Sequence, residues 1–248
     1  MASRERYAVV SCHVERPLDD AIWVRFSALQ EDRPGGFAVA ALMRPADPAT
    51  GEDESRWLDR AREAAARGPI GHHTHWTAPD HARPVNGDTA ARVRAEGERM
   101  GELGLAPTLF CGGGWYTDAD VAQVCSDLGY VDCTFRAVRP PHLAPGERWA
   151  TLPSPARVQL PSGRLVRVIP TTHSLGDVGR ALLRRQPLPR VVHVYFHDTD
   201  LLDRRRRAMI QTLLPLLARR AGATDLDALT AGMIDDGPVV TWDDVARL

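Results

Sequence analysis

The regular alternation of β-prone and helix-forming segments is the feature that most constrains the fold of this 248-residue chain. Apolar runs rich in Val, Ile and Phe are followed by stretches of strong helix formers, about seven times over. This pattern is typical of β/α units, in which parallel strands are covered by helices. Since no repeat, low-complexity segment or linker divides the chain, we expect one domain over residues 1–248.

The expected strands are bounded by Gly, Pro and polar clusters. They cover residues 7–15, 37–43, a segment carrying the histidines at 71–76, and residues 107–111, 130–135, 164–169 and 190–197. Helices are expected at 21–30, 52–67, 88–103, 118–128 and 203–220, with a short one after residue 174. Residues 136–170 form an irregular, proline-rich insertion followed by a hairpin that turns at Ser162-Gly163. The tail, 224–248, is expected to pack back on the body.

Charge and apolar content exclude several partners. With 31 basic and 32 acidic residues the formal net charge is −1, which favours neither nucleic acid nor an anionic membrane. The sequence has no run of eighteen apolar residues and no apolar segment near its charged N-terminus. The four cysteines form no CxxC pair. We therefore expect a cytoplasmic protein with reduced thiols, and the sequence specifies no oligomeric state.

The densest group of potential metal ligands is Gly71-His72-His73-Thr74-His75-Trp76. On an extended backbone His73 and His75 project from the same face, because side chains alternate along a strand. Two imidazoles on one rigid segment can bind a divalent metal. His72 faces the other way on a regular strand, so we interpret it as structural.

Two other strand ends carry polar residues at the same spacing of two. His13 and Glu15 end the first strand, and His193, Tyr195 and His197 share one face of the last. If these strands are parallel members of one barrel, their C-terminal ends meet at one mouth, where barrel enzymes keep their sites. The sequence therefore predicts a functional site at that mouth.

The order of these motifs resembles the polysaccharide deacetylase superfamily (NodB-like, carbohydrate esterase family 4), over roughly residues 9–217. Residues 11–15 resemble its first motif, which has two acidic residues, and residues 71–76 resemble its metal-binding histidine pair. Residues 110–116 look like the loop whose backbone helps to form an oxyanion pocket. Residues 194–198 look like the late strand that ends in a catalytic histidine. The resemblance implies a distorted (β/α)₇ barrel that removes N-acetyl groups from sugars with a divalent metal.

The chain departs from the family pattern at two places. His13 stands where the family has its usual acidic base. The family's histidines are four apart, whereas four residues after His73 comes Thr77, so we choose His73 and His75 as the pair. A divergent member of the superfamily is the resulting interpretation.

We assign one divalent ion to Glu15, His73 and His75, since imidazole and carboxylate ligands suit zinc and also cobalt or nickel. His13 could take the proton of the attacking water or serve as a fourth ligand. His197 is expected to protonate the leaving amine, with Asp198 or a neighbouring carboxylate setting its tautomer.

Substrate contacts are expected from the glycine-rich loop and from residues on the late strands. Consecutive glycines let the backbone approach a substrate closely, although a tight strand–helix turn explains them equally well. The expected substrate-binding residues are Gly113, Gly114, Trp115, Tyr116, His173 and Tyr195.

The function predicted by this site is a metal-dependent hydrolase that removes an acyl group, N-acetyl in the family, from a sugar or glycan-like substrate. Hydrolysis of a cyclic amide or another C–N bond on the same fold is one alternative. A glycan-binding pseudoenzyme is another, since the first acidic residue of the family's first motif is missing. A phosphoesterase of the PHP type also uses His-x-His pairs, but usually on the first strand.

Overall fold

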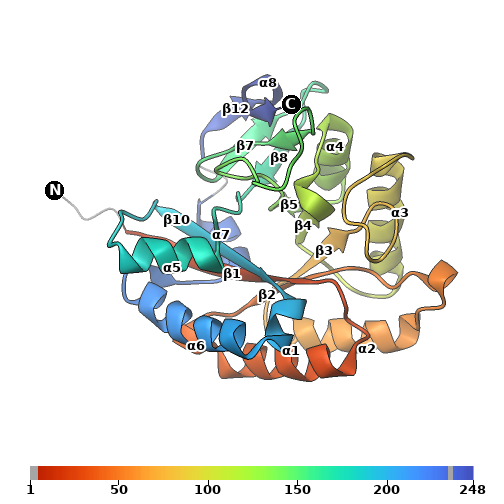
Figure 1. Ribbon diagram of the computed structural model, residues 1–248. Helices are drawn as coiled ribbons and strands as arrows, with labels where there is room; N and C mark the ends of the chain where they lie inside the picture. The colour runs from red at the N-terminus through yellow and green to blue at the C-terminus, as the bar shows by residue number, and fades with distance from the viewer. Residues whose placement is uncertain (1–4, 234–236, 248) are drawn as a thin grey trace.

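The computed structural model describes residues 5–233 and 237–247, and its centre is a mostly parallel sheet (Figure 1). The strands lie in the order β12-β7-β8-β5-β4-β3-β2-β1-β10-β9, and β11 pairs with β1. Their bounds are β1 (Tyr7–Val14), β2 (Ala40–Met43), β3 (Ile70–Thr74), β4 (Leu109–Gly112), β5 (Val131–Asp132), β7 (Ala156–Gln159), β8 (Leu165–Val168), β9 (His173–Ser174), β10 (Val191–His197), β11 (Gly222–Ala223) and β12 (Val239–Thr241). A separate antiparallel pair joins β6 (Trp149–Ala150) to β13 (Ala246–Arg247).

Most helices begin at an aspartate whose carboxylate caps the first turn. Asp19, Asp53, Asp88, Asp118 and Asp203 each accept a hydrogen bond from a backbone N–H two or three residues further on. The helices are α1 (Asp20–Asp32), α2 (Glu54–Ala65), α3 (Thr89–Glu102), α4 (Ala119–Asp127), α5 (Leu175–Leu183), α6 (Arg204–Ala218), α7 (Leu226–Met233) and α8 (Trp242–Val245). The expected helices of the body are confirmed, with ends that differ by one or two residues.

Three apolar clusters follow from the alternation along the strands. One contains Val10 and Trp57 and packs the sheet against α1, α2, α5 and α6, which lie together on one side in Figure 1. A second contains Phe110 and packs it against α3, α4 and the β7–β8 hairpin. In the third, alternate residues of β1, β2, β4, β5 and β10, such as Val9 and Leu109, meet Leu226 of α7.

The sheet has two ends, β9 and β12, so no closed barrel is formed by the strands of the described chain. The mixed α/β class with a mostly parallel sheet is confirmed, whereas the seven-stranded barrel is not. Residues 165–174 nevertheless contact two distant parts of the sheet: β8 pairs with β5, and β9 pairs with β10. Between them, Arg136 and Thr171 form an isolated parallel bridge.

Several local expectations are confirmed and others are shifted. The hairpin of β7 and β8 is antiparallel, and Gly163 in its turn has a φ of +84°. The fifth strand is much shorter than expected, and β2 starts at Ala40 rather than at residue 37. The tail does pack back, with β12 added beside β7. No helix in residues 5–233 and 237–247 is long and apolar enough to cross a membrane.

Candidate metal centre

The C-terminal ends of β1 and β3 bring three donor atoms together. Glu15 directly follows β1, and His75 directly follows β3, which carries His73. The Glu15 Oε1 atom lies 3.4 Å from the Nε2 of His75 and 3.8 Å from the Nε2 of His73. All three donor atoms lie within 4.8 Å of one another, a spacing that suits ligands sharing one ion.

The tautomers of His73 and His75 are fixed by backbone carbonyls. The Nδ1 atom of His73 lies 2.8 Å from the carbonyl oxygen of Cys111, and that of His75 lies 2.7 Å from that of Pro79. Since a carbonyl only accepts, each Nδ1 carries the proton and each neutral ring keeps a lone pair on Nε2. Both Nε2 atoms are buried without a hydrogen-bond partner. Histidines that bind metals are commonly held in this way by an outer acceptor.

The charge states of this group also suit metal binding. Burial raises the pKa of Glu15, but the imidazoles of His73 and His75 outweigh it, so the pKa lies well below its ordinary value. Burial lowers the pKa of His73. At neutral pH Glu15 is therefore a carboxylate and the His73 ring is neutral, the forms in which these two side chains bind a divalent ion.

His13 lies beside this group and belongs to two further sets of potential ligands. One set joins it to Glu15 and His197, and the other to His73 and Cys111. The His13 and His73 ring centroids are 4.6 Å apart, and the Cys111 Sγ lies 3.6 Å from the His13 Nε2. Burial lowers the pKa of His13 well below its ordinary value and raises that of Cys111, so both side chains are neutral.

His197 occupies the outer side of the group. Its backbone is paired in register with His13 across β1 and β10, and its Nε2 lies 3.6 Å from the Glu15 Oε1. The side chain is 37% exposed, compared with 2% for His73 and 4% for His75. His197 can therefore reach both the carboxylate and a ligand arriving from solvent.

The Asp198 carboxylate contacts Arg16 and not His197, the partner expected for it. Its Oδ2 accepts a hydrogen bond of 2.8 Å from the backbone N–H of Arg16, and its Oδ1 has no partner. Within the described chain no hydrogen bond joins it to His197. Burial raises the pKa of Asp198 to about 7. Its expected influence on the His197 tautomer stays a prediction that these contacts do not support.

A hollow of about 520 Å³ opens beside the donors, within the size range of small-molecule sites. Glu15 and His75 form part of its wall, and further residues come from the ends of neighbouring loops. These include Arg16, Asp19, Arg44, Glu52, Asp80 and Thr199. The hollow is polar enough to receive a hydroxylated ligand.

The glycine-rich loop owes much of its composition to close packing. A Cβ atom on Gly113 would lie 2.5 Å from the carbonyl oxygens of Thr74 and Ala82. Gly114 has a φ of +58°, and the Arg83 guanidinium donates to its carbonyl oxygen. These contacts show that a tight turn is sufficient to explain both glycines. The expected contact of Gly113 and Gly114 with substrate stays a prediction.

Trp115 and Tyr195 lie against the histidines. Their ring centroids are 5.2 Å and 5.4 Å from that of His13, and 4.7 Å from each other. Trp115 has a φ of +62°, a left-handed conformation that costs a non-glycine residue about 1 kcal/mol or more. Such strain is common at functional sites, and here it holds the indole beside His13.

Tyr116 and His173 contact other parts of the molecule. The Tyr116 hydroxyl donates to the Oδ2 of Asp118 at 2.6 Å, and its ring packs against Trp76. The Nδ1 of His173 lies 2.8 Å from the Oγ1 of Thr172. Neither residue belongs to a potential ligand set in the described chain, so their contact with substrate stays a prediction.

Arg136 is the site residue that sequence reasoning missed. Its guanidinium carbon lies 4.3 Å from the centre of the Trp115 ring and 4.8 Å from that of Tyr195. The residue is only 3% exposed, and its Nε and Nη1 atoms have no hydrogen-bond partner. The available signal was a charged residue directly after the expected strand at residues 130–135, but it fell at the start of the irregular insertion.

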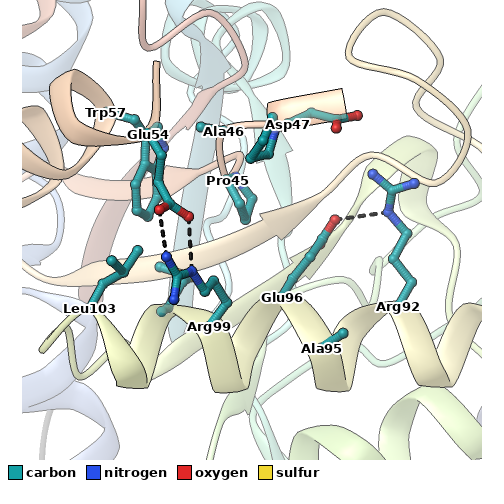
Figure 2. Close-up of a pocket in the computed structure, with 12 residues that line it drawn as sticks. Pro45, Ala46, Asp47, Glu54, Trp57, Arg92, Ala95, Glu96, Arg99 and Leu103 are labelled. Atoms are coloured by element: carbon teal, nitrogen blue, oxygen red, sulfur yellow. Dashed lines mark hydrogen bonds and ion pairs between the residues drawn. The ribbon is translucent and has the colours of Figure 1, made fainter. Parts of the chain in front are cut away.

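The opposite face of β3 holds a separate polar group. The Nε2 of His72 lies 2.8 Å from the Oε2 of Glu96 and 2.8 Å from the Oγ1 of Thr74. Glu96 and Arg92 project from α3, where a hollow of about 360 Å³ separates it from α2 (Figure 2). The described residues of this hollow form no potential metal-ligand set, and the structural role of His72 stays a prediction.

Comparisons with known proteins give a fold but no family. No family model matches the sequence, and neither does any curated protein. The 4-alpha-glucanotransferase from Thermococcus litoralis is similar over 95% of this chain, with 12% identity and a TM-score of 0.55. A mutant of a CE4 family pseudoenzyme with restored enzymatic activity is similar over 95% of this chain, with 10% identity and a TM-score of 0.53.

At such low identities these likenesses show the fold alone. This chain spans 40% of the glucanotransferase and 70% of the CE4 protein. It therefore shares with both proteins a fold of the mixed α/β type with a mostly parallel sheet. The chemistry of the site must be argued from its own residues.

Proposed function

We propose that this protein is a metal-dependent hydrolase that removes an acyl group, N-acetyl being the first candidate, from a sugar or glycan-like substrate. The observation that carries the proposal is the pair of buried, unpartnered Nε2 atoms of His73 and His75, which converge with the Glu15 carboxylate. A buried polar atom without a partner is costly, and a shared ion would satisfy both nitrogens at once.

The three donors fit a divalent ion in number and type. Two imidazoles and one carboxylate make up a ligand set that catalytic zinc sites use, with positions left for water and substrate. When bound, such an ion supplies an electrophile that polarises the amide carbonyl and activates water. Glu15, His73 and His75 would hold it, and the carbonyls of Cys111 and Pro79 keep both rings oriented.

His13 is proposed as the group that takes the proton of the attacking water. Its lowered pKa leaves the ring unprotonated, so the accepting form is the resting form. Trp115 and Tyr195 pack against this ring and limit its movement. The fourth-ligand role is the alternative, since His13 also belongs to two potential ligand sets.

His197 is proposed to protonate the leaving nitrogen as the carbon–nitrogen bond breaks. Its position at the exposed side of the group allows it to reach the amine while Glu15 lies 3.6 Å away. The amine then departs neutral and the acyl group departs as a carboxylate. The likeness to a CE4 protein supports this chemistry only through the shared fold.

The proposed site requires the strand ends to face one mouth. We propose that residues 165–174 complete a distorted seven-stranded barrel, because they pair with β5 through β8 and with β10 through β9. The third apolar cluster, which packs against α7, would then be the interior of the barrel. A single domain over residues 1–248 is part of the same proposal.

Acetate release tests the proposal. The purified protein is assayed for metal content and for acetate release from N-acetylglucosamine oligomers and from a cyclic amide. We expect about one divalent ion per chain. Acetate release should stop after the metal is removed by a chelator and resume when zinc is added. His81→Ala is a matched control, since this exposed histidine is outside the potential ligand sets.

Three outcomes would contradict parts of the proposal. Full metal content without acetate release, but with saturable glycan binding, would indicate a pseudoenzyme. Opening of the cyclic amide alone would move the reaction to another C–N bond. Absence of stoichiometric metal would overturn the metal centre itself.

A further inference from the structure

Arg136 carries a buried positive charge beside Trp115 and Tyr195, the two aromatic rings that lie against His13. Among the described residues no carboxylate lies within 4 Å of the guanidinium, although sixteen other close ion pairs or histidine–carboxylate contacts are formed. Two of its three nitrogens are buried without a partner. Since arginine stays charged in proteins, this is an unpaired buried cation.

The neighbouring aromatic rings offset only part of the resulting cost. Stacking on Trp115 and Tyr195 stabilises the guanidinium by cation–π attraction. The cost of removing an unpaired guanidinium from water is larger than this attraction. An anion arriving with the ligand would supply the missing hydrogen bonds and charge.

The position of Arg136 favours a role in substrate binding over a role in stabilising the fold. Trp115 and Tyr195 each lie against both Arg136 and His13. The two rings therefore connect the guanidinium to the proposed reacting group. Its backbone is separately fixed, by N–H donation to Ala150 and acceptance from Leu152.

We propose that Arg136 binds an anionic group of the substrate, so that the preferred ligand is an acidic sugar. This rests on the proposed function for the reaction beside it, but the binding of the anion does not depend on turnover. A planar guanidinium matches a carboxylate or a phosphate with paired hydrogen bonds. The carboxylate of a uronic acid and the phosphate of a sugar phosphate are the two sources to be compared.

Calorimetric binding of three small probes to the purified protein tests the proposal. D-glucuronate, D-glucose 6-phosphate and D-glucose share a ring and differ in charge. We expect at least one charged probe to bind roughly 10-fold to 100-fold more tightly than glucose, the range for hydrogen bonds to charged groups. Arg136→Met should abolish that preference, and Arg136→Lys should keep part of it. The charged probe that binds more tightly identifies whether the anionic group is a carboxylate or a phosphate.

Arg139→Met is the matched control, because it removes the same charge from an exposed residue of the same segment. Equal binding of all three probes to wild type would overturn the proposal. So would a preference that survives in Arg136→Met, which would place the anion on the metal instead. If Arg136→Met does not fold, Arg136→Lys must weaken charged probes at least about threefold without affecting glucose. Acetate release from neutral oligomers without any anion preference would leave the hydrolase standing and remove this inference.

Discussion

The two faces of β3 carry histidines in contrasting environments. On the outer face, His72 meets Glu96 at a hydrogen-bonding distance of 2.8 Å, and Arg92 donates to the same carboxylate. On the inner face, Glu15 lies at 3.4 Å and 3.8 Å from two imidazoles, too far for strong hydrogen bonds.

This difference separates a structural histidine from candidate ligands. In the outer group the Nε2 of His72 is partnered by Glu96 and Thr74, although its buried Nδ1 has no partner. The inner group leaves two Nε2 atoms facing one carboxylate with room between them, which an ion of the right size would fill. Adjacent residues on one strand can therefore serve stability and chemistry separately.

The largest expected effect comes from removing an inner ligand. In His73→Ala or His75→Ala, metal affinity should fall by more than about 100-fold. Loss of a residue that only hydrogen-bonds to a ligand costs up to about 100-fold, and loss of the ligand itself should cost more. Turnover should fall to background while circular dichroism stays unchanged. Elemental analysis after dialysis measures this, with His81→Ala as control. Normal metal content in both variants would remove the distinction between the two faces of β3.

His197→Ala should have the next largest effect. Loss of a general acid typically costs about 10²- to 10⁴-fold in rate, so amide turnover should fall by that order. Metal content should stay unchanged. Because an activated ester needs little protonation, its hydrolysis should suffer much less. Equal losses on both substrates, or loss of metal, would instead make His197 a ligand.

His72→Gln should affect stability rather than chemistry. Glutamine keeps a donor but not the imidazole, and Thr74 and Arg92 still donate to Glu96, so weakening of this one contact should cost about 0.5–1.5 kcal/mol in the free energy of unfolding. Urea denaturation measures this loss, and metal content should equal that of wild type. His73→Gln provides the contrast, with metal lost and the metal-free stability little changed. Metal loss in His72→Gln would contradict the structural role.

The smallest effect concerns acid pH. Burial raises the pKa of Glu96, but His72 and Arg92 outweigh it and place the folded-state pKa below its ordinary 4.5. A depressed carboxyl pKa contributes stability above the unfolded value, and this contribution is lost as pH falls through the folded value. The stability difference between wild type and Glu96→Gln should therefore shrink when pH falls below about 4.5. A difference that grows on acidification would be inconsistent with this pairing.

The convergence of Glu15, His73 and His75 could be predicted because it depends on local geometry. Side chains alternate along a strand, so the spacing of His73 and His75 places both on one face, and the same holds for His13 and Glu15. Parallel β/α topology then brings the strand ends to one edge of the sheet. The helices were found for a similar reason, since aspartate caps and apolar periodicity are local signals.

Contacts between segments that are far apart in the sequence could not be recognised from local sequence patterns. The pairing of His72 with Glu96 depends on how α3 packs against β3, and the contact of Cys111 with His13 depends on the spacing between strands. Arg136 lies between two aromatic rings that come from other parts of the chain. Tyr116 turns toward Asp118 because the left-handed turn before it sets its direction.

The most direct test of the metal centre is anomalous X-ray scattering at the zinc edge from crystals grown with zinc. We expect one strong peak about 2.0–2.2 Å from the Nε2 atoms of His73 and His75 and from a carboxylate oxygen of Glu15. The His72–Glu96 pair should show none. A peak between His13 and Cys111 instead, or no peak at the ends of β1 and β3, would contradict the account.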